Sequence, residues 1–193
     1  MDEAKKEEET TQKMGDQAMI SRSYLEKRTV FLWGGVDDDT AKHVIDRLMY
    51  LESEKPGEPI NFYINSPGGY VTSGMAIYDV MQMISSPVHT ICMGLAASMG
   101  SILLSGGEKG HRSVFKHGRV MIHQPSGGMQ GQSRDMEITV KQIVELRGEL
   151  YEILAKHTGK TYEEIDRDSD RDYWMKAHEA KEYGLVDEVL TRS

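Results

Sequence analysis

The stretch Val88-His-Thr-Ile-Cys-Met-Gly-Leu-Ala-Ala-Ser-Met-Gly-Ser-Ile-Leu-Leu104 places an apolar strand, a run of small residues and a helix in immediate succession. This pattern predicts a strand over Val88–Met93 and the start of a buried helix over Ser101–Leu104. Strands and helices alternate in the same way along the rest of the chain. Further strands are predicted over Thr29–Trp33, Ile60–Ile64, Val120–His123 and Leu185–Leu190, and helices after Asp37–Thr40, over Thr72–Ile84, over Ser133–His157, from Thr161 and over Ala177–Tyr183. Repeated β-α-β units imply parallel strands joined by right-handed crossovers, so the predicted fold class is α/β.

Ser98 lies between this strand and this helix. Its neighbours are small residues, which allow the backbone to turn sharply and expose a hydroxyl group. The helix N-terminus adds free N–H groups and the positive end of a dipole. The segment is therefore a candidate site for a nucleophilic serine, although Ala96 stands where the usual Gly-x-Ser-x-Gly pattern has its first glycine. A serine N-cap in a helix-packing turn is the alternative, and this segment alone does not separate the two.

Three other segments carry candidate functional groups. Ile64-Asn-Ser-Pro-Gly-Gly69 sets glycines between a strand and a helix, where main-chain N–H groups can approach a phosphate or a peptide oxyanion. A plain strand-to-helix turn is the alternative. His123 ends an apolar strand, as active-site bases often do, although a lone histidine is more often structural. A base needs an orienting acid, and Asp166-Arg-Asp-Ser-Asp-Arg-Asp172 offers four aspartates among which spacing does not choose.

The composition excludes several classes of protein. The 193 residues are 38% hydrophobic and 28% charged, which is typical of one globular domain. A net charge of −8 argues against nucleic acid or an anionic membrane as the main partner. No stretch approaches the roughly 20 apolar residues that span a bilayer. Cys92 is the only cysteine and is expected in the core, and no histidine pair has metal-ligand spacing with a carboxylate, so no metal site is predicted.

The N-terminal residues 1–17 differ in composition from the rest of the chain. They read MDEAKKEEETTQKMGDQ and contain neither the apolar core of a secretory signal nor the pattern of a transit peptide. A segment this charged is expected to be disordered in isolation. We therefore expect an acidic N-terminal segment over 1–17, a single domain over 18–193 and a cytoplasmic location.

Taken together, these segments resemble the proteolytic subunits of the Clp protease family. Six motifs keep the order and spacing of that family from about Val30 to Leu190, and this linkage favours the nucleophile interpretation of Ser98. The motifs are Tyr63-Ile-Asn-Ser-Pro-Gly-Gly69, Thr90-Ile-Cys-Met-Gly-Leu-Ala-Ala-Ser-Met-Gly100, Arg119-Val-Met-Ile-His-Gln-Pro125, Gly127-Gly-Met-Gln-Gly-Gln132, Asp170-Arg-Asp172 and Glu182-Tyr-Gly-Leu-Val-Asp187.

The resemblance implies a crotonase-like αβ superhelix with a projecting handle helix, here Ser133–His157. It implies serine endopeptidase activity, with Ser98 as nucleophile, His123 as general base and Asp172 as the acid that orients the base. It also implies an oxyanion hole, which is matched by Gly69 and Met99. A strand that pairs with the substrate backbone is matched by Gly127 and Gly128.

The resemblance also implies partners. Relatives hydrolyse unfolded polypeptides without a cofactor, and ATP is used by a partner AAA+ unfoldase. In this family, two heptameric rings stack through their handles. The rings are expected to be homomeric or to be mixed with a paralogue. Asp170 and Arg171 match a pair of residues that bridges the two rings. The unfoldase docks in a hydrophobic pocket, which is matched here by Tyr63, Ile91, Met93, Phe115 and Leu190.

Two departures from the family pattern concern docking. The stretch before Val30 is acidic and lacks the aromatic-Asp-Ile-Tyr-Ser-Arg-Leu-Leu run of relatives, and Asn61 and Ser113 stand where aromatic residues are common. They motivate the hypothesis of a divergent second isoform and an alternative function, a weakly active or regulatory ring-forming paralogue. A crotonase-type acyl-CoA enzyme is a third hypothesis, disfavoured because such enzymes normally work without this Ser/His/Asp set.

Overall fold

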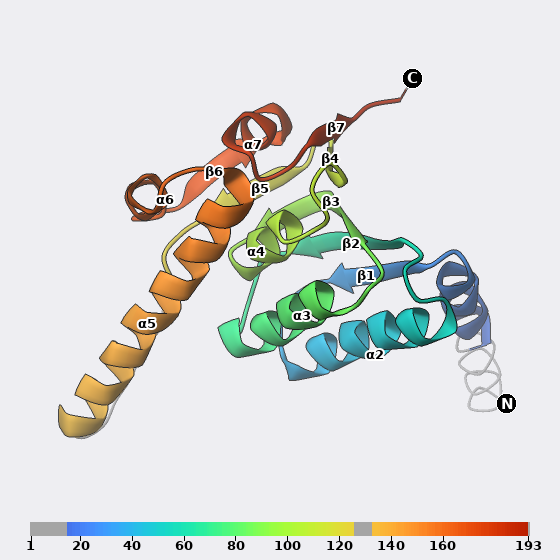
Figure 1. The fold of residues 1–193 in the computed structure, drawn as a ribbon, viewed down its shortest axis with the longest axis horizontal. Coiled ribbons are helices and arrows are strands. Elements are labelled where there is room, and N and C mark those ends of the chain that lie inside the picture. The colour runs from blue at the N-terminus through green and yellow to red at the C-terminus, as the bar shows by residue number, and fades with distance from the viewer. Residues whose placement is uncertain (1–14, 126–132, 193) are drawn as a thin grey trace, which may run out of the picture.

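The computed structural model describes residues 15–125 and 133–192, and its centre is a seven-stranded mixed sheet (Figure 1). Five strands follow one another in the order β1-β2-β3-β4-β7, and β5 pairs with both β3 and β6. The strands are β1 (Thr29–Trp33), β2 (Ile60–Ser66), β3 (Val88–Ala97), β4 (Arg112–Phe115), β5 (Arg119–Ile122), β6 (Tyr173–Lys176) and β7 (Glu188–Leu190).

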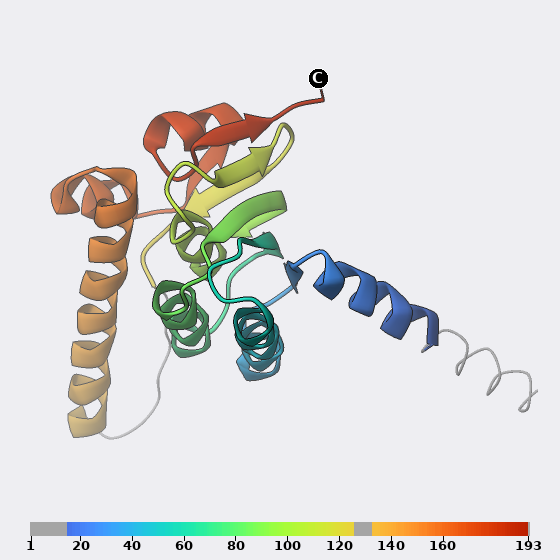
Figure 2. The same cartoon turned by 45° about the vertical axis from the view of Figure 1, so that its right-hand side comes forward.

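The helices α2 (Asp38–Glu54), α3 (Val71–Met83) and α4 (Met99–Ser105) cover one face of the sheet (Figures 1 and 2). Burial alternates along β2, as expected for a strand with one face in the core. The core includes Phe62 and Ile64 of β2, Leu48 of α2 and Leu103 of α4. Asp37 caps α2 by accepting a hydrogen bond from the backbone N–H of Thr40, as its sequence predicted.

The long helix α5 (Ser133–Thr158) projects from the body of the molecule, as Figures 1 and 2 show. Its C-terminal half is packed, with Leu150 and Leu154 buried. Its N-terminal half keeps exposed apolar side chains, among them Ile138, Val140 and Val144. Apolar residues recur at helical spacing on one side of this helix from Met136 to Leu154, and only those of its C-terminal half are buried within the chain.

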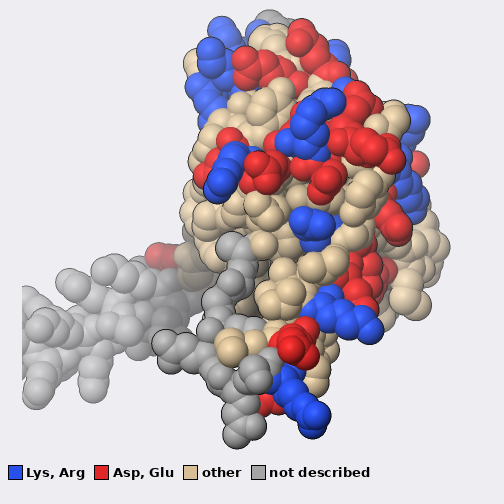
Figure 3. Space-filling view, turned by 90° about the vertical axis from the view of Figure 1, so that its left-hand side faces the viewer, with Lys and Arg blue, Asp and Glu red and all other residues tan. Residues whose placement is uncertain are grey.

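The short helices α6 (Tyr162–Asp168) and α7 (Ala177–Tyr183) complete the C-terminal part of the fold. Thr161 forms a capping box with Glu164 at the start of α6, and Gly184 ends α7 in the left-handed conformation with φ 96°. Acidic and basic side chains are interspersed over the described residues on the side of the molecule that carries α5 and α6 (Figure 3).

The prediction of parallel strands is correct for five of the six strand pairings and wrong for β6, which pairs antiparallel with β5. The sequence also missed β4 and β6, which are only four residues long. The last strand is shorter than predicted, since its pairing with β4 starts only at Glu188. Leu185 and Val186 are apolar because they are buried in the core before this strand. Among the described residues, no helix is both long enough and apolar enough to cross a membrane.

Residues 15–26 form a helix that leads into β1. The ring of Tyr24 packs edge-on against Phe31 of β1 at 4.8 Å between centroids, and Phe31 stacks on Tyr63 of β2 at 5.3 Å. The boundary predicted after residue 17 falls inside this helix. The remainder of the predicted disordered segment, residues 1–14, lies outside the described residues.

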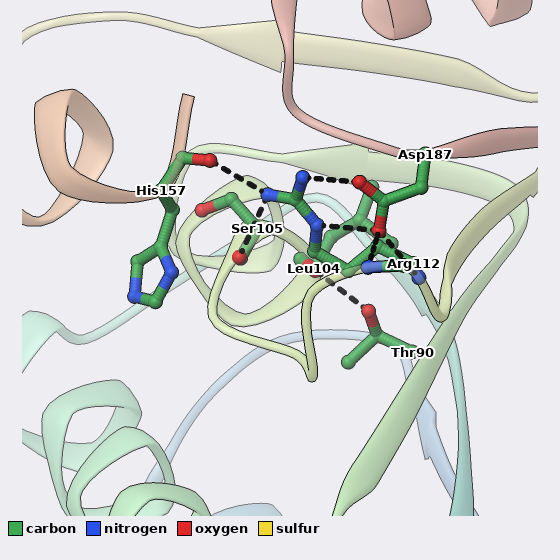
Figure 4. Close-up of polar contacts among 7 residues, drawn as sticks. Thr90, Leu104, Ser105, Arg112, His157 and Asp187 are labelled. Atoms are coloured by element: carbon green, nitrogen blue, oxygen red, sulfur yellow. Dashed lines mark hydrogen bonds and ion pairs between the residues drawn. The ribbon is translucent and has the colours of Figure 1, made fainter. Parts of the chain in front are cut away.

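The buried side chain of Arg112 forms hydrogen bonds at the ends of α4 and α5 and to the residue that precedes β7 (Figure 4). The guanidinium of Arg112 donates to both carboxylate oxygens of Asp187, at 2.5 and 2.9 Å. Its Nη1 also donates to the carbonyl oxygens of His157, near the end of α5, and of Ser105, at the end of α4. Burial alone would raise the pKa of Asp187, but these hydrogen bonds and the arginine charge outweigh burial and lower it.

His157 gives the fold a pH-dependent stability. Its Nε2 is hydrogen-bonded to the hydroxyl of Tyr78 at 2.8 Å, and burial, followed by the charges of Lys156 and Arg112, lowers the pKa of His157 to about 4. In the unfolded chain His157 therefore binds a proton near pH 6.5, whereas in the folded chain it binds this proton only near pH 4. We expect the free energy of unfolding to fall by about 2–3 kcal/mol between these pH values.

Urea unfolding of the wild type and of His157→Gln, each at pH 7 and pH 4.5, measures this contribution. The loss of stability on acidification should be smaller in His157→Gln, because glutamine has no proton to bind in this range. Equal losses in the two proteins would contradict the expectation.

Candidate active site

The backbone turns sharply at Ser98, between the end of β3 and the start of α4. Ser98 has φ 54° and ψ −123°, a conformation that side-chain-bearing residues rarely adopt. The turn is held from two sides: the N–H of Ser98 donates to the carbonyl oxygen of Met121 at 2.9 Å, and its own carbonyl oxygen accepts from the N–H and Oγ of Ser101. Strain fixed in this way at a strand-to-helix turn is characteristic of a nucleophile elbow.

Gly68 provides the space for this turn. It has φ 92°, and a Cβ atom built on it would lie 2.6 Å from the Cβ of Ser98 and 2.8 Å from the carbonyl oxygen of Ala97. Neither neighbour can move without displacing the hydroxyl of Ser98. A side chain at this position is thus excluded by both space and backbone conformation.

We expect Gly68→Ala to lower the kcat for a small peptide at least about 100-fold, since a displacement of about 1 Å at a reacting group has an effect of this size. The measurement is steady-state hydrolysis of a fluorogenic peptide. Gly57→Ala is the matched control: its φ is also positive, at 80°, but a Cβ there meets no atom within 4 Å. The expectation is wrong if the two variants retain equal activity.

The structure brings Ser98, His123 and Asp172 together. The Nε2 of His123 lies 2.9 Å from the Oγ of Ser98, and its Nδ1 lies 3.1 Å from the Oδ1 of Asp172. Since a carboxylate only accepts hydrogen bonds, Nδ1 carries the proton that bonds to Asp172, and a neutral imidazole then accepts the Ser98 proton at Nε2. This arrangement leaves Ser98 with a base in hydrogen-bond contact.

Strand pairing explains why Asp172 is the aspartate that meets His123. Ile122 of β5 is paired with Tyr173 of β6, so the residues that follow and precede them, His123 and Asp172, face each other across the end of the ladder. The side chain of Asp172 remains 58% exposed, and that of His123 is 24% exposed.

A small cavity opens beside the Ser98 hydroxyl, with a volume of about 60 Å³. Gly69 and Met99, the predicted oxyanion-hole residues, both line it. Met99 begins α4, and the first N–H groups of a helix have no partner inside the helix. The rest of the lining is mostly apolar and includes Val71, Ile102, Ile122, Leu150, Tyr151 and Leu154.

The sequence did not identify this apolar lining. Leu150 and Leu154 belong to the apolar residues that recur at helical spacing in the long helix, but this spacing does not show that the helix passes Ser98. A cavity of this composition can hold an apolar side chain next to Ser98.

The residues predicted for ring assembly and docking lie apart from the cavity. Asp170 and Arg171 are exposed in the turn before Asp172 and form an ion pair at 3.9 Å. The predicted docking residues lie on β2, β3, β4 and β7: Tyr63 is in register with Ile91, Met93 is two residues further along β3, and Phe115 is in register with Leu190. Gly127 and Gly128, predicted to pair with substrate, lie outside the described residues.

The predicted core role of Cys92 is confirmed, because its side chain is fully buried and burial raises the pKa of its thiol to about 12. Across residues 15–125 and 133–192, no three His, Cys, Asp or Glu side chains come close enough together to hold a metal ion.

This geometry places the molecule among the serine hydrolases, since hydroxyl, imidazole and carboxylate stand in hydrogen-bonded sequence beside a helix N-terminus. A family model described as Clp protease matches residues 12–193. Two proteins named ATP-dependent Clp protease proteolytic subunit, from two strains of Bacteroides fragilis, are each 56% identical to the chain over 165 residues. The match covers 86% of this chain and 80% and 75% of the two relatives.

The chain belongs to the Clp protease family. Its fold is the crotonase-like fold of that family, as predicted, and it is a serine-type endopeptidase. Both relatives carry the name of the proteolytic subunit, which does not favour the alternative of a weakly active or regulatory paralogue. The acyl-CoA enzyme considered from sequence is not supported by any of these matches.

Proposed function

We propose that Ser98, His123 and Asp172 are the catalytic residues of a peptidase that cleaves unfolded polypeptides. The hydrogen bond between the Ser98 Oγ and the His123 Nε2, 2.9 Å long, is the observation that carries the proposal. His123 acts as general base for Ser98, and Asp172 holds the imidazole in the tautomer that leaves Nε2 free to accept a proton.

The reaction proceeds through an acyl-enzyme. His123 takes the proton of Ser98 while the Oγ attacks the carbonyl carbon of a peptide bond, and the protonated imidazole then gives this proton to the leaving amine. Water, activated by the same imidazole, hydrolyses the ester and releases the second product. The Nε2 of His123 takes up and gives back each proton, first between Ser98 and the leaving amine and then between water and Ser98, so the steps balance without a cofactor.

The backbone N–H groups of Gly69 and Met99 form the oxyanion hole in this proposal. Support comes from their position on the wall of the cavity beside Ser98 and from the free N–H groups at the start of α4. The apolar cavity accepts the substrate side chain next to the cleaved bond, which favours cleavage after residues with a small or medium apolar side chain.

The active form is proposed to be a homo-oligomer of two stacked heptameric rings. The exposed apolar side chains on the projecting half of α5 support this proposal, because such a row of side chains is stabilised when a second helix covers it. Met136, Val140 and Val144 lie four residues apart on one side of the helix and are 37%, 56% and 51% exposed. Asp170 and Arg171 are proposed to contact the facing ring next to Asp172.

The remaining proposals concern substrate delivery and location. An AAA+ unfoldase, which itself uses ATP, docks on the outer sheet surface around Tyr63, Ile91, Met93, Phe115 and Leu190. The peptidase domain spans 18–193, and the protein works in the cytoplasm without nucleic acid or membrane as a partner. Asn61 and Ser113, where relatives often have aromatic residues, make this docking surface more polar.

Labelling with a serine-reactive fluorophosphonate tests the proposed site. The reagent is expected to modify one serine, identified as Ser98 by peptide mass spectrometry, and to leave Ser98→Ala unmodified. Ser105→Ala is a matched control, because Ser105 lies in the same helix and is buried, with its Oγ bonded to the carbonyl oxygen of Ile102. Modification of another serine, or equal labelling of Ser98→Ala, would rule the proposal out.

A further inference from the structure

Gln124 joins the strand that carries the base to the turn that carries the acid. Its backbone N–H donates to the carbonyl oxygen of Ser169 at 2.6 Å, and its side-chain Nε2 donates to the carbonyl oxygen of Asp170 at 2.8 Å. The donor residue directly follows His123, and the two acceptors lie just before Asp172. Gln124 therefore crosslinks the two segments at the point where the base meets the acid.

Asp172 is held in place from both ends of its segment. After it, β6 starts at the next residue and pairs with β5. Before it, the turn is attached to β5 through the two hydrogen bonds of Gln124. Between these attachments, the side chains of Asp170 and Arg171 are 72% and 92% exposed, and an ion pair this exposed contributes little to the position of the turn.

We infer that Gln124 is a positioning residue for the reaction: its side-chain amide holds the turn where Asp172 meets His123. The carboxylate of Asp172 needs such support, because it is 58% exposed and its contact with the Nδ1 of His123 is 3.1 Å long. Burial therefore does not fix it. The inference rests on the catalytic roles proposed above for Ser98, His123 and Asp172, and it adds a residue that touches neither the substrate nor the reacting atoms.

Gln124→Met tests the amide, because methionine keeps the length and approximate volume of glutamine but cannot donate. The kcat for a fluorogenic peptide is expected to fall about 10- to 100-fold with KM within about twofold, since only the orientation of the base changes. Gln124→Glu also lacks the donor and should lose at least as much. Gln82→Met is the control: Gln82 makes the same kind of bond, Nε2 to the carbonyl oxygen of Gly106 at 2.8 Å, away from the site, and should keep the wild-type kcat.

A double-mutant cycle with Asp172→Asn separates positioning from a general structural role. The readout is the second-order rate of Ser98 acylation by a fluorophosphonate, which remains measurable in slow variants. Gln124→Met should lower this rate at least about tenfold in the wild-type background and less than about twofold in the Asp172→Asn background. Gel filtration should show both Gln124 variants with the assembly size of the wild type.

Equal losses in the two backgrounds would overturn the inference, as would a kcat of Gln124→Met within twofold of the wild type or a smaller assembly in gel filtration. Failure of the proposed catalytic roles would be visible elsewhere, with Gln124 intact. In that case Asp172→Asn or Ser98→Ala would hydrolyse the peptide at the wild-type rate.

Discussion

Ser98→Ala is expected to lower the kcat for peptide hydrolysis by about a millionfold, the size of effect that loss of a serine nucleophile has in other serine peptidases. Without the Oγ no acyl-enzyme can form, and His123 has no proton to accept. Substrate binding should change little, because the cavity wall is built by other side chains, such as Ile102 and Leu154. The measurement is hydrolysis of a fluorogenic peptide at saturating concentration, together with binding of the same peptide.

The fold should survive this substitution. The contacts that hold the turn use the backbone of Ser98, since its N–H donates to Met121 and its carbonyl oxygen accepts from Ser101. The melting temperature and the assembly size are therefore expected to match those of the wild type. A kcat within about tenfold of the wild-type value, in a preparation free of contaminating peptidase, would show that Ser98 is not the nucleophile.

The strands with apolar runs could be predicted from the sequence because a buried strand has few alternatives. Thr29–Trp33 was predicted with its observed bounds, and the glycine after it marks its end. β5, also four residues long, was predicted from its aliphatic run Val120-Met-Ile122, whereas the equally short β4 and β6 have no such run to separate a strand from a loop. Their existence depends on neighbours that are distant in sequence: β7 pairs with β4, and β5 pairs with β6.

The difference between local and long-range signals also explains which residues of the candidate site could be predicted. Local sequence makes Ser98 a candidate, since small residues surround a strand-to-helix turn, but it does not separate a nucleophile elbow from a serine N-cap. Asp172 is not, because four aspartates share its acidic run and only the register of β5 with β6 places one of them opposite His123. If Tyr173–Lys176 had been predicted as a strand that pairs with β5, Asp172 would have followed from the pattern. The wall formed by Leu150 and Leu154 depends on the packing of α5 beside α4, which no local pattern contains.

Arg112→Met is expected to have the largest effect on stability of the substitutions considered, about 3–5 kcal/mol, because it leaves the carboxylate of Asp187 partly buried without its partner. The arginine side chain is 4% exposed and that of Asp187 21%. The carbonyl oxygens of Ser105 and His157 lose a donor in the same step. Urea unfolding at fixed protein concentration measures the loss, since assembly also contributes to stability.

Arg22→Met is the matched control, because the pair of Arg22 with Glu26 is exposed on both sides, and its loss should change stability by less than about 1 kcal/mol. Adding Asp187→Leu to Arg112→Met should recover part of the loss, because the unpaired carboxylate, and not the missing attraction, accounts for most of the cost. No recovery in the double variant would mean that the bonds to the two carbonyl oxygens dominate. In that case the main role of Arg112 is to join the ends of α4 and α5, the two helices that lie beside Ser98 and its cavity.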